Sequence, residues 1–303
     1  MTDLRHLRYF VAVAEELHFG NAARRLHMSQ PPLSKRIAEL EADLGVRLLD
    51  RDNRHVELTA AGKVLLDRAR LILGAVASAR RAVQLATQDG TSIRVALPPE
   101  TSGSVVLEIL GGSEDFHGKV NLIEASTSEQ QRLFAEGELD IGVLRHPYDE
   151  DGLISSRPLF QELGVILSEN HHLASRDEIN LPDLSGSPLV AFPRAMAPGL
   201  YDDILEKSRN AGYSPIYILH NLRQASTLLI ALNGVAFRPK SALEPAGMFS
   251  TSAALKWKPI AGSKLYWRTS VVTRNNDIPG IRSICRVIET ALQKHDDWLA
   301  SSK

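Results

Sequence analysis

The sequence predicts a mixed α/β protein that begins with a winged helix-turn-helix, continues through a long helix and ends in a two-lobed α/β domain. Three observations carry this prediction. Two short helical patterns joined by a tight turn lie within the first 45 residues, and a long alanine-rich helical pattern follows them. From about residue 92, short apolar strands alternate with helices, which is typical of a largely parallel sheet covered by helices.

The second short helix is predicted to begin after Ser29, a residue type whose hydroxyl caps helices by accepting from a first-turn amide. Pro31 and Pro32 are tolerated there because first-turn amides have no intrahelical partner. The opposite face presents Pro31, Ser34 and Lys35, small, hydroxyl and cationic groups that suit the major groove of DNA. One apolar stripe with spacings of four, three and four should face the core: Leu33, Ile37, Leu40 and Leu44.

An ordinary helical hairpin with a solvated polar face is the alternative for two such helices. Their neighbours favour DNA binding. Residues 17–38 contain four Lys or Arg and no acid, and an apolar helix at residues 4–17 gives the pair a third element to pack on. Residues 46–58 resemble two short strands around a polar tip, which would be the wing. Arg54 at that tip can reach a phosphate or a narrow minor groove.

Composition excludes several classes of protein. The net charge is −1, with 14 Lys/Arg against 11 Asp/Glu in residues 1–90 and 21 against 25 in the remainder, so the chain is not a polycation. A single cysteine, Cys285, excludes an internal disulfide and a cysteine-rich metal site. We expect no cofactor. No long apolar segment or signal-peptide pattern is present, which predicts a cytoplasmic protein without a membrane partner.

A long helix is predicted from Thr59, as its N-cap, to about Gln88. A solvated linker is one interpretation. The small residues along one face favour a second interpretation, in which this helix pairs closely with the same helix of a second copy.

Eight strands are predicted in the remaining chain: residues 94–97, 120–125, 139–144, 165–168, 189–192, 216–219, 235–237 and 265–273. Ligands of open α/β sheets bind beyond the carboxyl ends of strands, often at helix N-termini. Three such places follow the first strands, at residues 98–102, residues 126–128 and Arg145. Capping of the next helix by Thr127 or Ser128 is the simpler interpretation, and it is compatible with ligand binding.

Four segments make the N-terminal region resemble the LysR-type transcriptional regulators: Leu4–Phe10, Ala22–Ser34, Leu40–Arg51 and Leu58–Gly62. The match covers about sixty residues, and its Ser-Gln-Pro-Pro form is similar to regulators of aromatic-compound catabolism. The resemblance implies a DNA-binding regulator that is not an enzyme. Its expected partners are double-stranded DNA, a small-molecule effector and further copies of itself, with RNA polymerase as another candidate.

The resemblance also implies a domain organisation. We expect a DNA-binding domain at 1–58, a linker and dimerisation helix at 59–90, and a periplasmic-binding-protein-like effector domain at 91–303. Its first lobe would comprise about 92–161 and 268–303, and its second about 162–267. Dimers should pair through the lobes into a tetramer on an inverted-repeat site. The residues expected at DNA are Gln30, Pro31, Pro32, Ser34 and Lys35 at base edges, with Arg36 and Arg54 at phosphates or in the adjacent minor groove.

An effector, expected to be an organic anion such as an aromatic acid or its ring-cleavage product, should lie between the lobes, and a cationic or neutral effector is the alternative. Glu100 departs from the hydroxyl common in aromatic-responsive members, and it would repel a carboxylate unless Arg145 or Arg194 neutralises it. A solvated acid favoured by a helix dipole is the alternative for Glu100. Arg238 replaces an aliphatic residue, and either a salt bridge or a ligand contact would explain it. The candidate effector-binding residues are Glu100, Thr101, Ser102, Thr127, Arg145, Arg194, Ala195 and Met196.

Two rival classes fit less well. The catalytic motifs G-x-S-x-G and H-E-x-x-H, the P-loop and the dinucleotide fingerprint are absent, and the adjacent His171 and His172 point differently and make a poor metal pair. A solute-binding protein would share the two-lobed fold. That class leaves the first 90 residues unexplained and would need an export signal.

Overall fold

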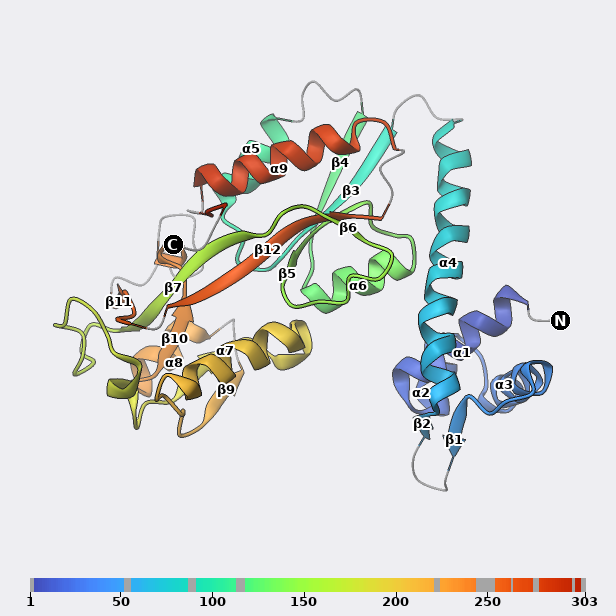
Figure 1. Cartoon of the computed structure of the whole chain (residues 1–303), viewed down its shortest axis with the longest axis horizontal. Coiled ribbons are helices and arrows are strands. Elements are labelled where there is room, and N and C mark those ends of the chain that lie inside the picture. Colours follow the sequence, from blue (N-terminus) through green and yellow to red (C-terminus); the bar gives the residue numbers. More distant parts are fainter. Residues whose placement is uncertain are drawn as a thin grey trace. The chain divides into compact units, whose positions relative to one another are not determined.

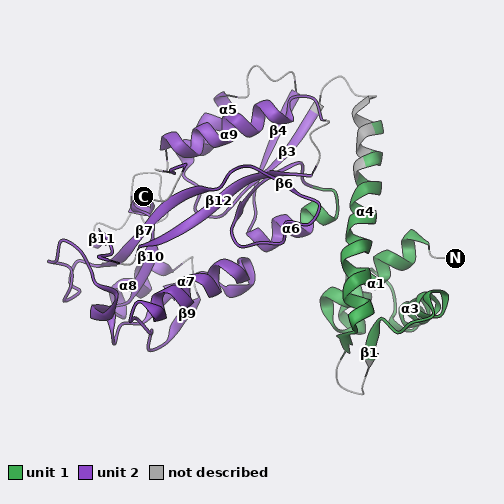
Figure 2. Cartoon of the chain, viewed as in Figure 1, with its two compact units in different colours: residues 1–87, 133–138 green, residues 88–132, 139–303 purple. Residues whose placement is uncertain are grey.

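The computed structural model describes residues 3–51, 56–86, 91–112, 118–220, 224–243, 254–262, 264–274, 278–295 and 298–300. The chain divides into two compact units, residues 1–87 with 133–138 and residues 88–132 with 139–303 (Figure 2). Figure 1 shows helices and one small two-stranded sheet in the N-terminal part, and a large sheet flanked by helices in the rest.

The N-terminal unit packs three helices against a short antiparallel ladder. These elements are α1 (Leu4–Glu16), α2 (Phe19–Arg25), α3 (Gln30–Leu44), β1 (Leu49–Arg51) and β2 (Val56–Leu58). The predicted apolar stripe of α3 is confirmed at Leu33, Ile37 and Leu40, which are fully buried in the unit's core. The prediction is wrong for Leu44, which is 40% exposed, because α3 ends there and Gly45 turns the chain away with φ 70°.

Ser29 lies at the N-cap of α3, as expected, but its hydroxyl makes no capping hydrogen bond. The expected hydrogen bond is wrong for a chemical reason. A cap accepts from the amide of the second or third helical residue, and here these residues are Pro31 and Pro32, which have no amide hydrogen.

Two other side chains hold the ends of these helices. Nδ1 of His18 accepts from the amides of Gly20 (3.0 Å) and Asn21 (3.2 Å), which caps α2. Oε1 of Glu41 accepts from the amides of Leu48 (2.9 Å) and Leu49 (3.2 Å), which ties α3 to the first strand of the ladder. The ladder agrees with the predicted wing. Its tip, with Arg54, lies outside the described residues.

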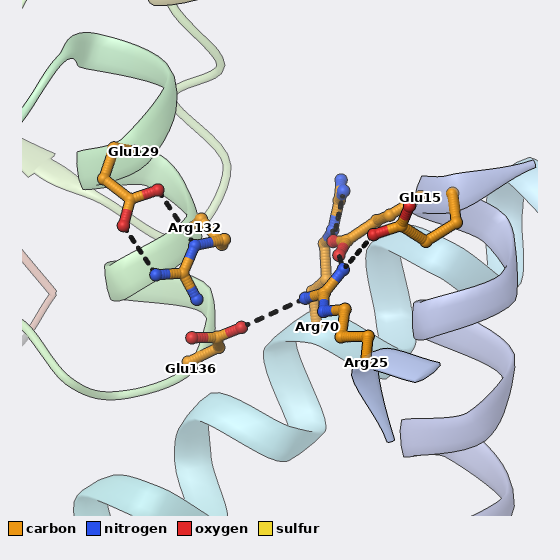
Figure 3. A network of polar contacts seen from close by, with 7 residues as sticks. Glu15, Arg25, Arg70, Glu129, Arg132 and Glu136 are labelled. Carbon is orange, nitrogen blue, oxygen red and sulfur yellow. Dashed lines mark hydrogen bonds and ion pairs between the residues drawn. The ribbon is translucent and has the colours of Figure 1, made fainter. Parts of the chain in front are cut away.

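The predicted long helix is α4 (Ala60–Ala86), 27 residues that span about 40 Å at 1.5 Å per residue. Thr59 caps it as expected, since its hydroxyl accepts from the amide of Gly62 at 2.9 Å. A polar network joins α4 to the helices before it (Figure 3). The carboxylate of Glu15 accepts from Arg25 of α2 and from Arg70 of α4, each at 2.8 Å.

The C-terminal unit is built on one sheet with the order β4-β3-β5-β12-β7-β10-β8-β9, to which β6 and β11 add at β12 and β7. All eight predicted strands are confirmed, and β6 and β11 were not predicted. The bounds are β3 (Thr91–Leu97), β4 (Gly118–Glu124), β5 (Ile141–Arg145), β6 (Ile154–Ser155), β7 (Leu159–Ser168), β8 (Leu189–Ala191), β9 (Ile218–His220), β10 (Val235–Arg238), β11 (Leu255–Lys258) and β12 (Leu265–Thr273).

The long antiparallel strands β7 and β12 connect two lobes. Residues 159–163 of β7 pair with residues 265–269 of β12. Beyond this shared stretch, β12 continues alongside β5, and β7 continues alongside β10. Strands β3, β4 and β5 are parallel to one another in the first lobe, and β8, β9 and β10 are parallel in the second.

Helices cover this sheet. In the first lobe, α5 (Gly103–Gly111) and α9 (Ile281–His295) pack together on one face and α6 (Thr127–Ala135) lies on the other (Figure 1). The second lobe carries α7 (Pro198–Asn210) and α8 (Ala225–Ala231). Three short 3-10 helices complete the unit: η1 (Leu181–Leu184), η2 (Arg194–Met196) and η3 (Lys240–Leu243). Within the described ranges, each helix is too short or too polar to cross a bilayer.

Candidate functional site

The first half of α3 presents the face predicted to meet DNA. Gln30, Pro31, Pro32 and Lys35 are exposed, and Ser34 is half-buried beside the core stripe. The sequence pattern therefore placed these side chains on the solvent side of the helix. These side chains carry an amide, a hydroxyl, an ammonium and two apolar rings. The polar groups can donate hydrogen bonds to base edges, and the rings can contact the methyl group of thymine.

The basic residues around α3 have different surroundings. Arg25 pairs with Glu15 at 2.8 Å and Glu16 at 3.6 Å, so it belongs to the network that holds α1 and α2. Arg36 is exposed and pairs with Glu39, one turn further along α3, at 2.9 Å. A pair of this kind is weak in water, so the guanidinium of Arg36 can exchange Glu39 for a phosphate.

A small pocket lies between the lobes of the C-terminal unit. It has a volume of about 20 Å³, room for roughly one water molecule. Sites for organic ligands are usually about 300–1,000 Å³, so an organic molecule enters only when the lobes or these side chains move. The first lobe contributes Pro98, Pro99, Glu100, Ser126, Thr127 and Arg145 to the wall, and the second contributes Phe192, Met196, Ala197 and Leu200.

Thr127 begins α6 and is buried in this wall. Its hydroxyl accepts from the backbone amide of Arg145 at 3.4 Å, a long contact between α6 and the end of β5. The helix is capped by Ser126, whose hydroxyl accepts from the amide of Glu129 at 3.3 Å. The expected cap, Thr127 or Ser128, is therefore wrong by one or two residues, because the capping residue is Ser126.

Gln130 fixes the start of α6 in place. It is fully buried, and its amide nitrogen donates to the carbonyls of Ala125 (2.8 Å) and Val143 (3.1 Å). Its amide oxygen accepts from the backbone of Val143 at 2.9 Å. Nothing in the sequence pattern indicated this role of Gln130. Three hydrogen bonds from one side chain hold Thr127 against β5.

The guanidinium of Arg145 stacks on an aromatic ring. Its Cζ lies 3.6 Å from the ring centroid of Trp267, and Nη2 donates to the carbonyl of Pro99 at 3.1 Å. Trp267 is buried on the crossing strand β12. Trp267 was not among the residues predicted for the site. A cation–π contact in a desolvated site orients the guanidinium and leaves its edge for hydrogen bonding.

Glu100 and Arg238, the two departures from the family pattern, pair with each other. Oε2 of Glu100 lies 2.9 Å from Nε of Arg238, and the side chains are only 7% and 3% exposed. The interpretation of Glu100 as a solvated acid is therefore wrong, and the salt bridge considered for Arg238 is confirmed. The pair joins the lobes, since Glu100 follows β3 and Arg238 ends β10.

The remaining candidates lie outside the wall of the pocket. Arg194 is 60% exposed and makes a two-point contact with Asp202, at 2.9 and 2.6 Å, which raises the pKa of Arg194 and lowers that of Asp202. Ala195 beside it is not a lining residue. The hydroxyl of Thr101 donates to the carbonyl of Pro98 at 2.7 Å, and Ser102 caps α5. The wall of the interlobe pocket therefore brings together four of the eight candidate residues: Glu100, Thr127, Arg145 and Met196.

The described residues contain no group of three His, Cys, Asp or Glu side chains that could hold a metal ion. The expectation that His171 and His172 point differently is wrong, because their rings stack with centroids 4.4 Å apart, and His171 is buried. Burial lowers the pKa of His171. Its ring bonds to Ser187 and to the backbone of Leu173, which gives it a structural role.

Two family models match the chain: "Bacterial regulatory helix-turn-helix protein, lysR family" over residues 4–63, and "LysR substrate binding domain" over residues 86–292. The regulator AlsR of Bacillus subtilis (strain 168) is 36% identical over 253 residues, 79% of this chain and 81% of AlsR. The regulator ClcR of Pseudomonas putida is 32% identical over 294 residues, 92% and 95% of the two chains. The crystal structure of CbnR, a LysR family transcriptional regulator, covers 95% of this chain and 100% of its own, with 26% identity and a TM-score of 0.53. The chain therefore belongs to the LysR family, as a DNA-binding transcriptional regulator with an effector-binding domain.

Proposed function

We propose that this regulator binds an inverted-repeat promoter site as a dimer of dimers and responds to an organic anion, an aromatic acid or its ring-cleavage product. Residues 1–58 would bind DNA, 59–90 would dimerise, and 91–303 would bind the effector. One observation supports the proposal most directly. The interlobe pocket brings a buried hydroxyl, Thr127, and a stacked guanidinium, Arg145, to one helix N-terminus, which is a suitable environment for a carboxylate.

On the DNA side, we assign Gln30, Pro31, Pro32, Ser34 and Lys35 to base edges and Arg36 and Arg54 to phosphates. The exposed face of α3 supports the first group. CbnR, whose fold this chain shares, has a structure with its target DNA. Phosphate contacts position a protein on DNA, and base contacts carry its sequence preference.

Replacing Gln30 with alanine should therefore relax sequence preference at one position. The expected loss is about 1–3 kcal/mol for the preferred base pair, with little change for operators that already carry another base there. Arg36→Ala is the matched comparison, and it should weaken all sequences alike. Fluorescence anisotropy on all single-base variants of one half-site would measure both. If Gln30→Ala lowered the affinity for all sequences equally, Gln30 would not contact a base edge.

Dimerisation through α4 is supported by the apolar side chains that this helix exposes. Val64, Ile72 and Val83 are 64%, 44% and 67% exposed, and Ala75 and Ala79 are exposed between them. At 100° per residue these five positions fall within about 100° of helix surface. A stripe of small and β-branched residues fits a second α4.

Assembly of dimers through the lobes has separate support. The first lobe exposes Leu107 and Leu110 of α5 and Ile123 of β4, and the second exposes Ile230 of α8 and Leu232 beside it. Exposed apolar residues on both lobes could be covered reciprocally by a second dimer across a two-fold axis.

Effector binding should depend on the hydroxyl of Thr127. In calorimetric titrations of the full-length protein with benzoate, we expect Thr127→Val to weaken binding by about 1.5–3 kcal/mol, the contribution of a hydrogen bond to a charged group. Thr227→Val on the exposed side of α8 is the matched control. Benzoate binding that is equal in wild type, Thr127→Val and Arg145→Ala would place the aromatic acid outside this pocket.

A further inference from the structure

Arg238 is a buried guanidinium of the second lobe, and the carboxylate that pairs with it comes from the first lobe. Its Nε lies 2.9 Å from Oε2 of Glu100, and its Nη1 donates to the carbonyl of Phe237 at 2.8 Å. Its Cζ lies 5.8 and 6.0 Å from the ring centroids of Trp267 and Phe192. Aromatic rings and one carboxylate therefore surround a cation that is only 3% exposed.

The geometry of this ion pair is poor. Neither Oε2 of Glu100 nor Nε of Arg238 has a hydrogen-bond partner among the described residues, although the two atoms are only 2.9 Å apart. A buried ion pair offsets the desolvation of its charges only when hydrogen bonds align and the remaining lone pairs are satisfied. A carboxylate with freedom to align would therefore bind Arg238 better than Glu100 does.

The backbone conformation of Glu100 is a second unfavourable feature of this ion pair. Its φ is 73°, in the left-handed region that side chains other than glycine, asparagine and aspartate rarely adopt. Such a conformation persists only where surrounding contacts hold it. Release of Glu100 from Arg238 would allow the loop after β3 to relax.

The pair also lies at the boundary of two small pockets. Glu100 lines the interlobe pocket, Arg238 lines a second pocket of about 20 Å³ in the second lobe, and Phe192 lines both. The second pocket is otherwise apolar, with walls from β8, α7 and β10, and Arg238 is the one charged residue among its lining residues. Because Phe192 is the wall that the two spaces share, displacement of Glu100 together with rotation of the Phe192 ring would join them beside the guanidinium.

We propose that Arg238 is an anion-binding residue of the effector site, and that Glu100 occupies its anion position until an effector carboxylate displaces it. This inference rests on the proposed function in placing the effector between the lobes. It extends that function by adding Arg238, besides Arg145, as a cationic contact of the acid, and by making Glu100 a competitor of the effector. The free protein then holds its lobes together with a carboxylate of its own.

Chemical rescue of Glu100→Ala tests this proposal without knowledge of the effector. In the full-length variant, sodium acetate should raise the melting temperature saturably compared with sodium chloride at equal ionic strength, because acetate takes the vacated position on Arg238. The rise should vanish in Glu100→Ala/Arg238→Met. Wild type and Glu162→Ala, which breaks an exposed pair with Lys264, should show no acetate-specific rise.

A second variant covers the case in which Glu100→Ala fails to fold. Glu100→Gln keeps the volume and removes the competing charge, so it should bind benzoate at least tenfold more tightly than wild type. Absence of an acetate-specific rise in folded Glu100→Ala, or persistence of the rise in the double variant, would overturn the proposal. Where wild type binds benzoate, unchanged or weaker benzoate binding by Glu100→Gln would overturn it as well.

The two proposals fail separately. If acetate rescues Glu100→Ala and neither wild type nor Glu100→Gln binds an aromatic acid, Arg238 still binds carboxylates and only the aromatic class is wrong. If wild type binds benzoate through Thr127 and acetate has no specific effect on folded Glu100→Ala, the proposed function holds and Arg238 has a structural role.

Discussion

Replacing Ile72 with glutamate is expected to convert the proposed α4-mediated dimer to a monomer and to weaken operator binding by about 10²–10⁴-fold. A charge in the middle of the exposed stripe of α4 would have to be desolvated between two helices. Loss of the dimer removes the effective-concentration gain that links two half-sites. Light scattering at micromolar concentration and anisotropy with the full operator would measure the two effects.

Lys63→Gln is the matched control for this experiment. It also shifts the net charge by −1, and Lys63 is exposed nine residues before Ile72, on the opposite side of the helix. We expect this control to remain a dimer. An Ile72→Glu protein that also remained a dimer would mean that the partners meet through another surface.

Replacing Trp267 with alanine is expected to lower the free energy of unfolding of the effector domain by about 3–5 kcal/mol, the usual range for a buried aromatic residue. Trp267 is 1% exposed on β12, one of the two strands that connect the lobes. The same change removes the ring beneath Arg145, so benzoate affinity should fall as well. Denaturant unfolding followed by circular dichroism would measure the stability.

Trp267→Phe separates the two roles of the ring. The indole nitrogen of Trp267 has no hydrogen-bond partner within the described part of the chain, so its removal eliminates an unsatisfied buried donor and offsets part of the lost packing. Phe should retain most of the stability and a surface for Arg145. A loss with Trp267→Ala below about 1 kcal/mol would mean that neighbouring side chains collapse into the space.

The sequence predicted best those features that depend on local periodicity. The stripe of α3 was recognised because Leu33, Ile37 and Leu40 recur at helical spacing. The long helix was recognised from its N-cap Thr59 and its alanine-rich run. β6 and β11 were missed because neither is an apolar run. β6 has only two residues, both exposed, and β11 carries two lysines in the sequence Leu-Lys-Trp-Lys.

The interlobe pocket depends on contacts between residues far apart in the chain, and there the prediction was incomplete. Glu100 and Arg238 were each recognised as unusual, but 138 positions separate them, and their pairing follows from the way the two lobes close. Arg194 was expected to supply charge to the effector. Its partner Asp202 is only eight residues away, in the next helix, so this pairing could have been considered from the sequence.

The two prolines in the first turn of α3 affect how this protein can hold the DNA backbone. A helix N-terminus usually offers several unpaired amides to a phosphate, and Pro31 and Pro32 remove two of them. Charge neutralisation on the operator would then fall to mobile cationic side chains, each of which releases condensed counterions. The slope of log affinity against log salt concentration, about −0.9 for each neutralised phosphate, should therefore report directly on how many lysines and arginines contact the duplex.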